Sequence, residues 1–362
     1  MKFNEFKTEQ WMTKYENETI YNLTDTCVYP LTYKQLLSLD KDNTINDKVL
    51  SYGEISGDNK LKKEILKLYK TGSIENIITS TGCLKANESI MMSLLSKGDT
   101  VLTFIPSYQQ FLDIPKAIGC KVLTLKYYEN NNWLPDFNEI KDIFSKHKIK
   151  MIIINSPNNP TGTYWNIEMF NKLIKICAKQ KTYILNDEVY RGLNVTKEVS
   201  ISDIYEYGIS TSSLSKIYAL PGLRLGWIKA NKDIIDKLLI LRDYSFISTG
   251  PLIDNLGLIA LKNKKYLLNR SKKIINENKK IVKQFIEENK QFELVMPEYG
   301  TVSFLSYNTK EKSKNLCLRL LKESGLFFVP GYCFDYEYHL RLTFTNDPGI
   351  TKKGLEFLKN SV

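Results

Sequence analysis

One lysine of the sequence stands where a reactive amine could form. Lys216 lies in the segment 213–227, SLSKIYALPGLRLGW, among small and apolar residues. Burial and positive neighbours both disfavour the ammonium form of a lysine, and a neutral amine condenses with an aldehyde. Arg224 lies in the same segment, and its planar guanidinium can donate two parallel hydrogen bonds to a phosphate. The segment predicts a neutral amine beside an anion site; the alternative is a surface loop with a chance lysine among 51 Lys and Arg residues.

A second group of chemically useful residues is the run DEVY at 187–190, which ends the apolar stretch TYILN. A carboxylate at the mouth of a buried strand is costly unless it meets a positive partner, and a protonated heterocyclic nitrogen is such a partner. Tyr190 could donate a hydrogen bond to a neighbouring oxygen. The alternative for Asp187 is an ordinary aspartate that caps a helix.

Two turns lie close to these residues in the expected fold. Residues 155–162, NSPNNPTG, follow the apolar run KMIII, and their prolines and asparagines predict a rigid turn that aims an amide side chain. Residues 79–82, TSTG, lead an apolar run into a helix, where free backbone N–H groups and the helix dipole attract an anion. A stiff connection without a ligand is the alternative for both turns.

The elements that must position these residues follow from the apolar pattern between about residues 74 and 230. Seven short β-rich runs are strand candidates: IENIITS, DTVLTFI, CKVLTLK, KMIIINS, KTYILND, GISTSSLS and RLGWIKA. Amphipathic stretches lie between them, for example residues 84–96 and 167–179. This alternation predicts an α/β domain whose largely parallel sheet is covered by helices.

The rest of the chain predicts a smaller α+β domain and an N-terminal arm. A lysine-rich helical region, 232–289, leads into the strand-like runs QFELVM and TVSFLSY, a helix near 313–324, and the runs LFFV and LRLTFT. We therefore expect an arm over residues 1–45 that packs on the small domain, a large domain over 46–240 and a small domain over 241–362.

Composition excludes several classes of protein. With 43% hydrophobic and 25% charged residues among 362, the chain is typical of a globular protein. None of the six cysteines forms a CxxC pair and there are only two histidines, so we expect reduced thiols and no metal site. The net charge of +11 comes from scattered lysines, so we expect no nucleic-acid site. No apolar run spans a membrane and the start lacks a signal pattern, so we expect a cytoplasmic protein.

In content and in order along the chain, these motifs resemble the fold type I pyridoxal-phosphate enzymes, and within them the class I/II aminotransferases. The resemblance implies pyridoxal 5'-phosphate as the cofactor, held by Lys216 as a Schiff base. It implies a large domain with a mostly parallel seven-stranded sheet sandwiched by helices, and a smaller α+β domain. It also implies a homodimer with shared active sites, because Tyr52 in YGEISG looks like the family tyrosine that reaches the phosphate in the neighbouring subunit.

The resemblance also assigns the residues of one phosphate site. The glycine turn before a helix corresponds to Gly82, Cys83 and Leu84, whose backbone would hold the phosphate. The SxSK motif and the arginine after it correspond to Ser213, Lys216 and Arg224, which complete the cofactor contacts.

Further residues are assigned to the cofactor ring and the substrate. Tyr108 in PSY would stack on the ring, and Asp187 would meet the pyridine nitrogen. Asn159 of NPTG and Tyr190 would bind the ring oxygen. Arg341 in LRLTF would clamp the substrate carboxylate, next to Asn159.

The activity implied is transamination between an α-amino acid and a 2-oxo acid, with Lys216, Asp187 and Tyr190 as the catalytic residues. The same groups serve lyases and cyclases. Residues 22–39 and 242–252 resemble capreomycidine synthase-like members, which are cyclases, whereas the retained Tyr190 favours transamination. A non-enzymatic regulator would need a DNA-binding domain, and the first forty residues show no helix-turn-helix pattern. Tyr29 and Tyr299 are candidates to line the substrate pocket.

Overall fold

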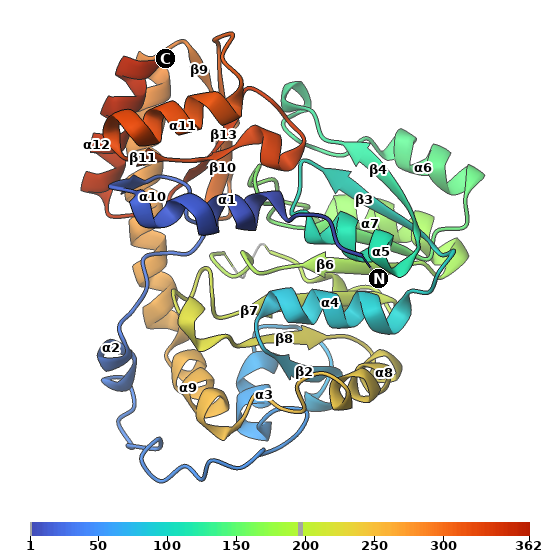
Figure 1. Cartoon of the computed structure of the whole chain (residues 1–362). Coiled ribbons are helices and arrows are strands. Elements are labelled where there is room, and N and C mark those ends of the chain that lie inside the picture. The colour runs from blue at the N-terminus through green and yellow to red at the C-terminus, as the bar shows by residue number, and fades with distance from the viewer. Residues whose placement is uncertain (1, 195–197) are drawn as a thin grey trace.

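The computed structural model of the chain describes residues 2–194 and 198–362. Figure 1 shows a large unit built around a twisted sheet, a smaller unit of helices and short strands beside it, and helix α1 (Lys7–Tyr15) running between the two. The predicted fold class, an α/β domain with a smaller α+β companion, is confirmed.

The sheet of the large unit has seven strands in the order β2-β8-β7-β6-β5-β3-β4. These strands are β2 (Ile77–Ser80), β3 (Thr100–Ile105), β4 (Lys121–Lys126), β5 (Met151–Asn155), β6 (Tyr183–Asp187), β7 (Gly208–Ser213) and β8 (Gly226–Lys229). Neighbouring strands are parallel except that β8 runs antiparallel to both β2 and β7. Each of the seven predicted runs forms one strand.

Helices cover both faces of this sheet because its strands are apolar on both sides. In β5 every residue is buried, with Ile152 and Ile154 in one core cluster and Ile153 in another. The covering helices are α4 (Cys83–Leu94), α5 (Gln110–Ile118), α6 (Phe137–Lys146), α7 (Ile167–Cys177) and α8 (Lys232–Asp243). Asn166 caps α7 by accepting from the backbone N–H of Met169. The two predicted helices correspond to α4 and α7.

The smaller unit holds a four-stranded antiparallel sheet in the order β12-β13-β10-β9. Its strands are β9 (Phe292–Glu293), β10 (Val302–Tyr307), β12 (Val329–Pro330) and β13 (His339–Thr343), and its helices are α10 (Lys264–Glu288), α11 (Ser313–Ser324) and α12 (Pro348–Ser361). Helix α9 (Pro251–Lys262) packs instead on α3 (Asn59–Leu66), beside the large sheet. The domain division at residue 240 stays a prediction.

The N-terminal segment contacts both units. Its strand β1 (Tyr21–Asn22) pairs in parallel with β11 (Leu326–Phe327), and α2 (Tyr33–Leu37) follows. In α1, the indole N–H of Trp11 donates to the carbonyl of Phe328 at 2.8 Å. At the start of α1 the backbone N–H of Lys7 donates to Gln109 Oε1 at 2.9 Å, which ties the helix to the large unit. Helix α1 therefore bridges the space between the units, as Figure 1 shows.

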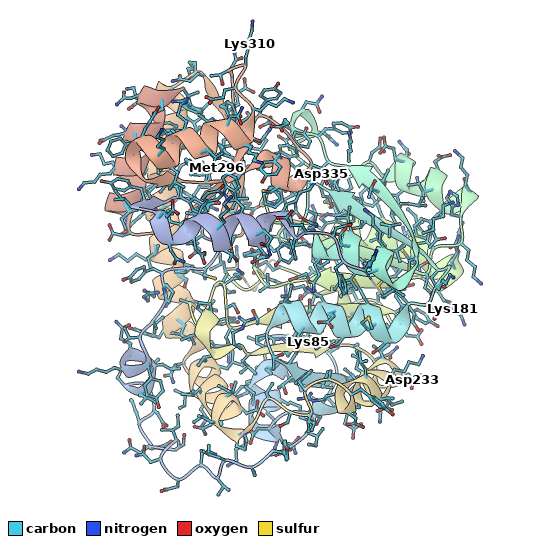
Figure 2. All side chains as sticks on the ribbon, viewed as in Figure 1. Lys85, Lys181, Asp233, Met296, Lys310 and Asp335 are labelled. Carbon is cyan, nitrogen blue, oxygen red and sulfur yellow. The ribbon has the colours of Figure 1, made fainter. Side chains whose placement is uncertain are left out.

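The surface is rich in dispersed lysines. Figure 2 shows Lys181 and Lys310 at separate outer parts of the molecule, and both are exposed. All six cysteines are free thiols. Within residues 2–194 and 198–362, no three His, Cys, Asp or Glu side chains gather as a metal ion would require. None of the helices in those ranges has the length and apolar character needed to cross a bilayer.

Candidate active site

A cavity of about 320 Å³ lies at the carboxyl ends of the parallel strands, where open α/β sheets bind ligands. Helix α1 and the segment that follows β1 contribute to its wall. Most of the residues that the motifs single out line it: Cys83, Leu84, Tyr108, Asn159, Asp187, Tyr190, Ser213, Lys216, Arg224 and Arg341. Tertiary folding therefore brings together groups that lie up to 258 positions apart, since the list runs from Cys83 to Arg341 (341 − 83).

Asp187 ends β6 with its carboxylate buried at the cavity. Its Oδ2 accepts from Nδ2 of Asn87 at 2.7 Å, and its Oδ1 accepts from the Val189 backbone N–H at 3.0 Å and the Cys83 thiol at 3.4 Å. Burial raises the pKa of this carboxyl, and the three donors offset only part of the rise. A cationic N–H in the cavity would favour the charged form. The chain after Asp187 enters turns rather than a helix, so the helix-cap alternative is wrong.

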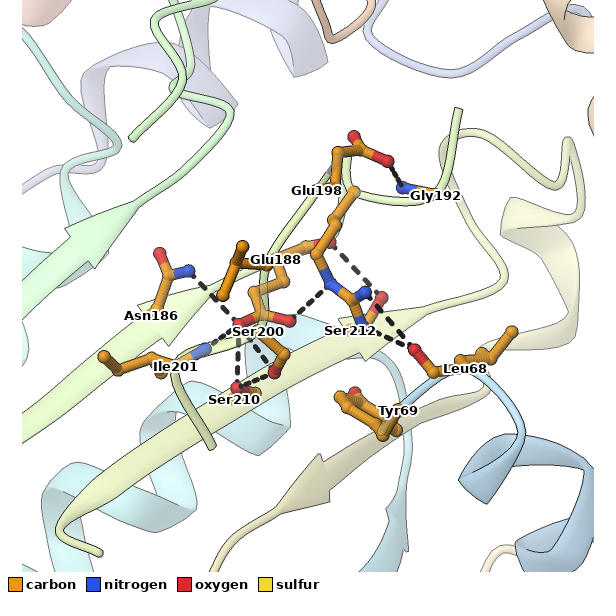
Figure 3. A network of polar contacts seen from close by, with 12 residues as sticks. Leu68, Tyr69, Asn186, Glu188, Gly192, Glu198, Ser200, Ile201, Ser210 and Ser212 are labelled. Carbon is orange, nitrogen blue, oxygen red and sulfur yellow. Dashed lines mark hydrogen bonds and ion pairs between the residues drawn. The ribbon is translucent and has the colours of Figure 1, made fainter. Parts of the chain in front are cut away.

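The neighbouring Glu188 does not line the cavity and belongs to a buried polar network (Figure 3). Its Oε1 accepts from the hydroxyls of Ser200 and Ser210 at 3.0 and 2.7 Å, and its Oε2 pairs with Nε of Arg191 at 2.6 Å. A buried carboxylate with this many donors is held in one orientation. The network thus anchors the loop that carries Asp187 and Tyr190.

Lys216 projects into the cavity from the loop after β7. Its Nζ donates to Thr26 Oγ1 at 2.6 Å and to Cys27 Sγ at 3.4 Å. Burial lowers the pKa of this ammonium. Interactions with Cys27, Tyr190 and Asp25 raise the pKa by more than burial lowers it, so the net shift is upward. The expectation that the chain itself makes this amine neutral stays a prediction, because the upward shift comes largely from charged forms of Cys27 and Tyr190, and the pKa values of both groups are themselves raised.

Gly82 and Arg224 form a narrow cradle at the start of α4. Gly82 has φ +86°, and a Cβ there would lie 2.7 Å from Nη2 of Arg224. The Arg224 guanidinium donates to the carbonyl of Pro221 at 3.1 Å and reaches the cavity wall. Because Gly82 offers no side-chain cap, the first N–H groups of α4 have no side-chain acceptor. Free helix N–H groups beside a guanidinium are suited to a phosphate.

Arg341 brings a second guanidinium into the cavity from β13, where it is 4% exposed. Nε donates to the carbonyl of Thr24 at 3.0 Å, Nη1 to Oδ1 of Asn159 at 3.4 Å, and Nη2 lies 4.0 Å from Sδ of Met12. All these partners are uncharged. A buried guanidinium without an anion is costly, so this site is suited to a carboxylate ligand.

The two tyrosines of the site are held differently. The Tyr108 hydroxyl donates to Oε1 of Glu9 at 2.8 Å, and its ring lies 4.9 Å from that of Phe6, both in or next to α1. Tyr190 is 2% exposed, and burial raises the pKa of its phenol while Lys216 and Arg341 lower it. Both hydroxyls therefore remain protonated donors at neutral pH.

Four residues proposed from the sequence are absent from the cavity lining: Gly82, which lies beside the lining residue Arg224, and Tyr52, Tyr29 and Tyr299. Tyr52 is 69% exposed, and its carbonyl accepts from the Ser248 hydroxyl at 2.5 Å. Its contact with a neighbouring subunit stays a prediction. Tyr29 is exposed, and Tyr299 packs its ring 4.6 Å from that of Tyr164; neither lines the cavity, so that prediction is wrong.

The sequence reasoning missed other residues of the site. Asn87 holds Asp187 and accepts from the Thr211 hydroxyl at 2.7 Å; an Asn next to the apolar face of α4 was the available signal. Thr26 and Cys27 contact Lys216 from a distant part of the chain. Five residues of the α1 region also line the cavity, namely Thr8, Glu9, Met12, Thr13 and Glu16. Their spacing is that of one helix face. The sequence shows this face, but it does not show which part of the fold the face borders.

Comparison with known proteins places these features in one family. The sequence matches the model for aminotransferase class I and II over residues 29–358. Capreomycidine synthase of Streptomyces vinaceus is 22% identical over 354 residues, which cover 96% of this chain and 91% of that protein. Aspartate aminotransferase of Thermotoga maritima is 25% identical over 291 residues, which cover 78% of this chain and 75% of that protein.

Solved structures agree. A PLP-dependent aminotransferase from Streptococcus suis is 35% identical with a TM-score of 0.96, over 100% of this chain and 98% of that one. The PLP-dependent cyclase OrfR has a TM-score of 0.89 at 20% identity, over 99% and 97% of the two chains, a likeness of fold alone. The resemblance predicted from the motifs is confirmed: the chain belongs to the class I and II aminotransferase family, and its cofactor is pyridoxal 5'-phosphate.

Proposed function

We propose that this protein moves an amino group between an α-amino acid and a 2-oxo acid. One observation carries the proposal: the amine of Lys216, the carboxylate of Asp187 and the guanidinium of Arg341 line the same cavity. These are the groups that proton transfer, cofactor activation and carboxylate binding require.

The residues present fit the cofactor. The cradle at Gly82, which a Cβ would fill, and the guanidinium of Arg224 are suited to its phosphate. The buried carboxylate of Asp187 is suited to its ring nitrogen, and Ser213, Tyr108 and the rest of the lining complete the cofactor site. When bound, pyridoxal 5'-phosphate supplies an electron sink for the substrate's α-carbon.

Each chain residue then has a defined task. Asp187 would keep the proton on the ring nitrogen, because a cationic N–H partner favours the charged form of this carboxylate and so opposes the rise that burial gives its pKa. Tyr190 and Asn159 would donate to the ring oxygen. The Nζ of Lys216, once free as an amine, would remove the α-proton and return it to the cofactor's aldehyde carbon.

Arg341 sets the geometry of the substrate. Its guanidinium would hold the α-carboxylate bidentately, and the contact from Nη1 to Asn159 keeps the fork aligned. Fixing the carboxylate orients the α-C–H bond for proton removal by Lys216.

A second candidate is a lyase or cyclase. Relatives that bear cyclase and synthase names match almost the whole chain, and the same groups can serve both reactions. Retention of Tyr190 supports transamination in preference.

A half-reaction screen tests the proposal. The purified yellow holoenzyme is mixed with single amino acids, and absorbance reports conversion of the cofactor to its amine form. Transamination predicts conversion with release of a 2-oxo acid; ammonia or a cyclised product without conversion would instead favour the second candidate. Arg341→Ala should lower kcat/KM by about 10²-fold or more, a loss of the size seen for misplaced substrates. Arg319→Ala, which removes a half-buried guanidinium of α11 that does not line the cavity, is the matched control.

We also propose a homodimer with shared active sites. The support is the exposed Tyr52, which belongs to a segment with an apolar surface, and family membership. A cytoplasmic location stays a prediction, and six free thiols agree with a reducing compartment.

A further inference from the structure

Resting on the proposed function, we infer that the amino acid handled in this cavity carries a positively charged side chain, bound by Glu9, Glu16 and Asp25. All three carboxylates belong to the N-terminal segment and line the cavity; together they are called the acidic wall. Substrates of this class have a side-chain ammonium or guanidinium, as lysine, ornithine and arginine do.

The first support is the composition of the α1 face that borders the cavity. Its members recur at positions 8, 9, 12, 13 and 16, the spacing of one side of a helix. They supply two carboxylates, two hydroxyls and a thioether, and no cation. The two lysines of α1 are engaged elsewhere, because Lys7 pairs with Asp335 at 2.5 Å and Lys14 lies over the ring of Tyr15.

The second support is that the chain does not neutralise these carboxylates with ion pairs. Glu9 accepts from the Tyr108 hydroxyl at 2.8 Å, and Asp25 accepts from the backbone N–H of Cys27 at 3.0 Å. In residues 2–194 and 198–362, no ion pair within 4.0 Å includes Glu9, Glu16 or Asp25. This is notable in a chain of net charge +11. The acidic wall stays available to a cationic ligand.

An independent observation is the hydroxyl of Thr8, on the same face. Thr8 is 2% exposed, lines the cavity, and its Oγ1 has no hydrogen-bond partner. A buried hydroxyl without a partner costs about 1–3 kcal/mol, and a ligand N–H that meets it after rotation of the Thr8 side chain would remove that cost. Ammonium and guanidinium groups donate only, so they match an acceptor flanked by carboxylates.

The positive groups of the lining argue against an acidic side chain. They are Lys216, Arg224 and Arg341, and the proposed function uses all three for the amine, the phosphate and the α-carboxylate. No further cation from the described residues of this chain lines the cavity to receive a second carboxylate. Glu9, Glu16 and Asp25 would repel such a group.

The test compares substrates that differ in charge at similar length. The holoenzyme is given L-lysine, L-ornithine or L-arginine, and separately the neutral norleucine and citrulline and the acidic L-glutamate. Absorbance records both binding and conversion of the cofactor. We expect kcat/KM for the cationic set to exceed that for the neutral set, and glutamate to be poorest.

Charge variants then locate the effect. Glu16→Gln should lower the lysine-to-norleucine ratio of kcat/KM by about twofold to fivefold, because Glu16 is exposed and a single ion pair there is weak. Glu18→Gln, an exposed carboxylate two residues on that does not line the cavity, should leave the ratio unchanged. Glu16→Gln/Asp25→Asn should lower it further.

The outcomes separate the two claims. If lysine binds more tightly than norleucine but no amino acid converts the cofactor, transamination fails while the cationic site stands. If norleucine or glutamate reacts as well as lysine, ornithine and arginine, or if none of the cationic amino acids binds, the inference is wrong whatever the reaction type.

Discussion

The groups around Lys216 shift the pKa of its side-chain amine in opposite directions. Burial favours the neutral amine, whereas Asp25 favours the ammonium, as the ionised form of Tyr190 would. Cys27 also adds to the upward shift. Because burial raises the pKa of the Cys27 thiol, this thiol is protonated at neutral pH and acts on Lys216 only as a dipole. Formation of the cofactor bond therefore requires proton loss from Lys216, with Thr26 and Cys27 at hydrogen-bond distance to guide the amine.

The residue-scale prediction concerns this anchor. Lys216→Ala should abolish the borohydride-reducible adduct with the cofactor and lower turnover by about 10²–10⁴-fold, the range that a general base contributes. Intact mass after borohydride treatment measures the adduct. Lys310→Ala, at an exposed loop, should retain it. An adduct of unchanged mass in Lys216→Ala would show that another lysine is the anchor.

At the scale of elements, short turns at the carboxyl ends of the strands carry the chemistry, and buried networks hold them. The turn after β2 needs Gly82, because its φ is positive and the guanidinium of Arg224 occupies the space of a side chain. The loop after β6 needs Glu188, because its carboxylate accepts five hydrogen bonds that fix the orientation of the side chain (Figure 3).

The first prediction at this scale separates the effect of backbone strain at Gly82 from the effect of losing the cradle that Gly82 forms with Arg224. Gly82→Ala should cost about 1–3 kcal/mol of backbone strain and also displace the Arg224 guanidinium, so the cofactor should dissociate more readily. Gly98→Ala has a similar φ, +91°, but no atom within 4 Å of the added Cβ. It should show the strain alone. Equilibrium dialysis of the cofactor, beside urea unfolding, distinguishes the two; equal cofactor loss in both variants would contradict the cradle.

A second prediction concerns the ion pair between Asp203 and Lys229 of β8, at 2.9 Å with side chains 5% and 2% exposed. Burial raises the pKa of Asp203, but hydrogen bonds from Lys229 and the backbone of Lys70 outweigh it, and the net shift is downward. A depressed folded-state pKa stabilises the fold above the unfolded value, about 3.9, and this stabilisation is lost as pH falls through the folded value.

Asp203→Asn should therefore lower the free energy of unfolding at pH 7 by about 3–5 kcal/mol, since it leaves the Lys229 ammonium buried and unpaired. The gap between the wild type and the variant should shrink as pH falls below about 4. Asp236→Asn breaks an exposed pair with Lys232 at 2.8 Å and should change little. Urea titrations over pH check both; a gap that is constant with pH would mean that the charge of Asp203 is not the cause.

At the scale of the whole molecule, one surface segment is unusually apolar. Val49, Leu50 and Tyr52 are 73%, 81% and 69% exposed, in the stretch that joins α2 to α3. Figure 1 shows this stretch at the lower edge of the large unit, away from the smaller sheet. Adjacent exposed apolar residues favour association, which agrees with a dimer.

At this scale we predict that sedimentation velocity will show an assembly with twice the mass of the 42.0 kDa chain. Leu50→Asp should shift the population toward monomer and lower activity in proportion, because each proposed site uses Tyr52 from its neighbour. Ile20→Asp alters an equally exposed apolar residue beside β1 and should leave the assembly intact. A fully active monomer of Leu50→Asp would rule out shared sites.

Much of this protein could be predicted from local patterns. Seven apolar runs became seven strands because a residue's fit to a doubly covered sheet depends on its own type and near neighbours. The motifs at 82, 159, 187 and 216 converged because carboxyl ends of parallel strands share one edge, whereas Arg341 reaches the cavity from β13 of the smaller sheet. Helix α9 was not separated from α10 in the lysine-rich region, and its packing on α3 is a long-range contact.

The sequence by itself determined the fold class, through apolar periodicity, and the chemical types in the cavity, through the motifs, while the cofactor came from the family resemblance that those motifs carry. Only the tertiary structure decided which side chains surround Lys216 and which way its pKa moves. It alone also showed that one face of α1 borders the cavity and that the hydroxyl of Thr8 has no partner. Electrostatics and hydrogen bonding act through space over a few ångströms, and chain order does not encode those distances until the chain has folded.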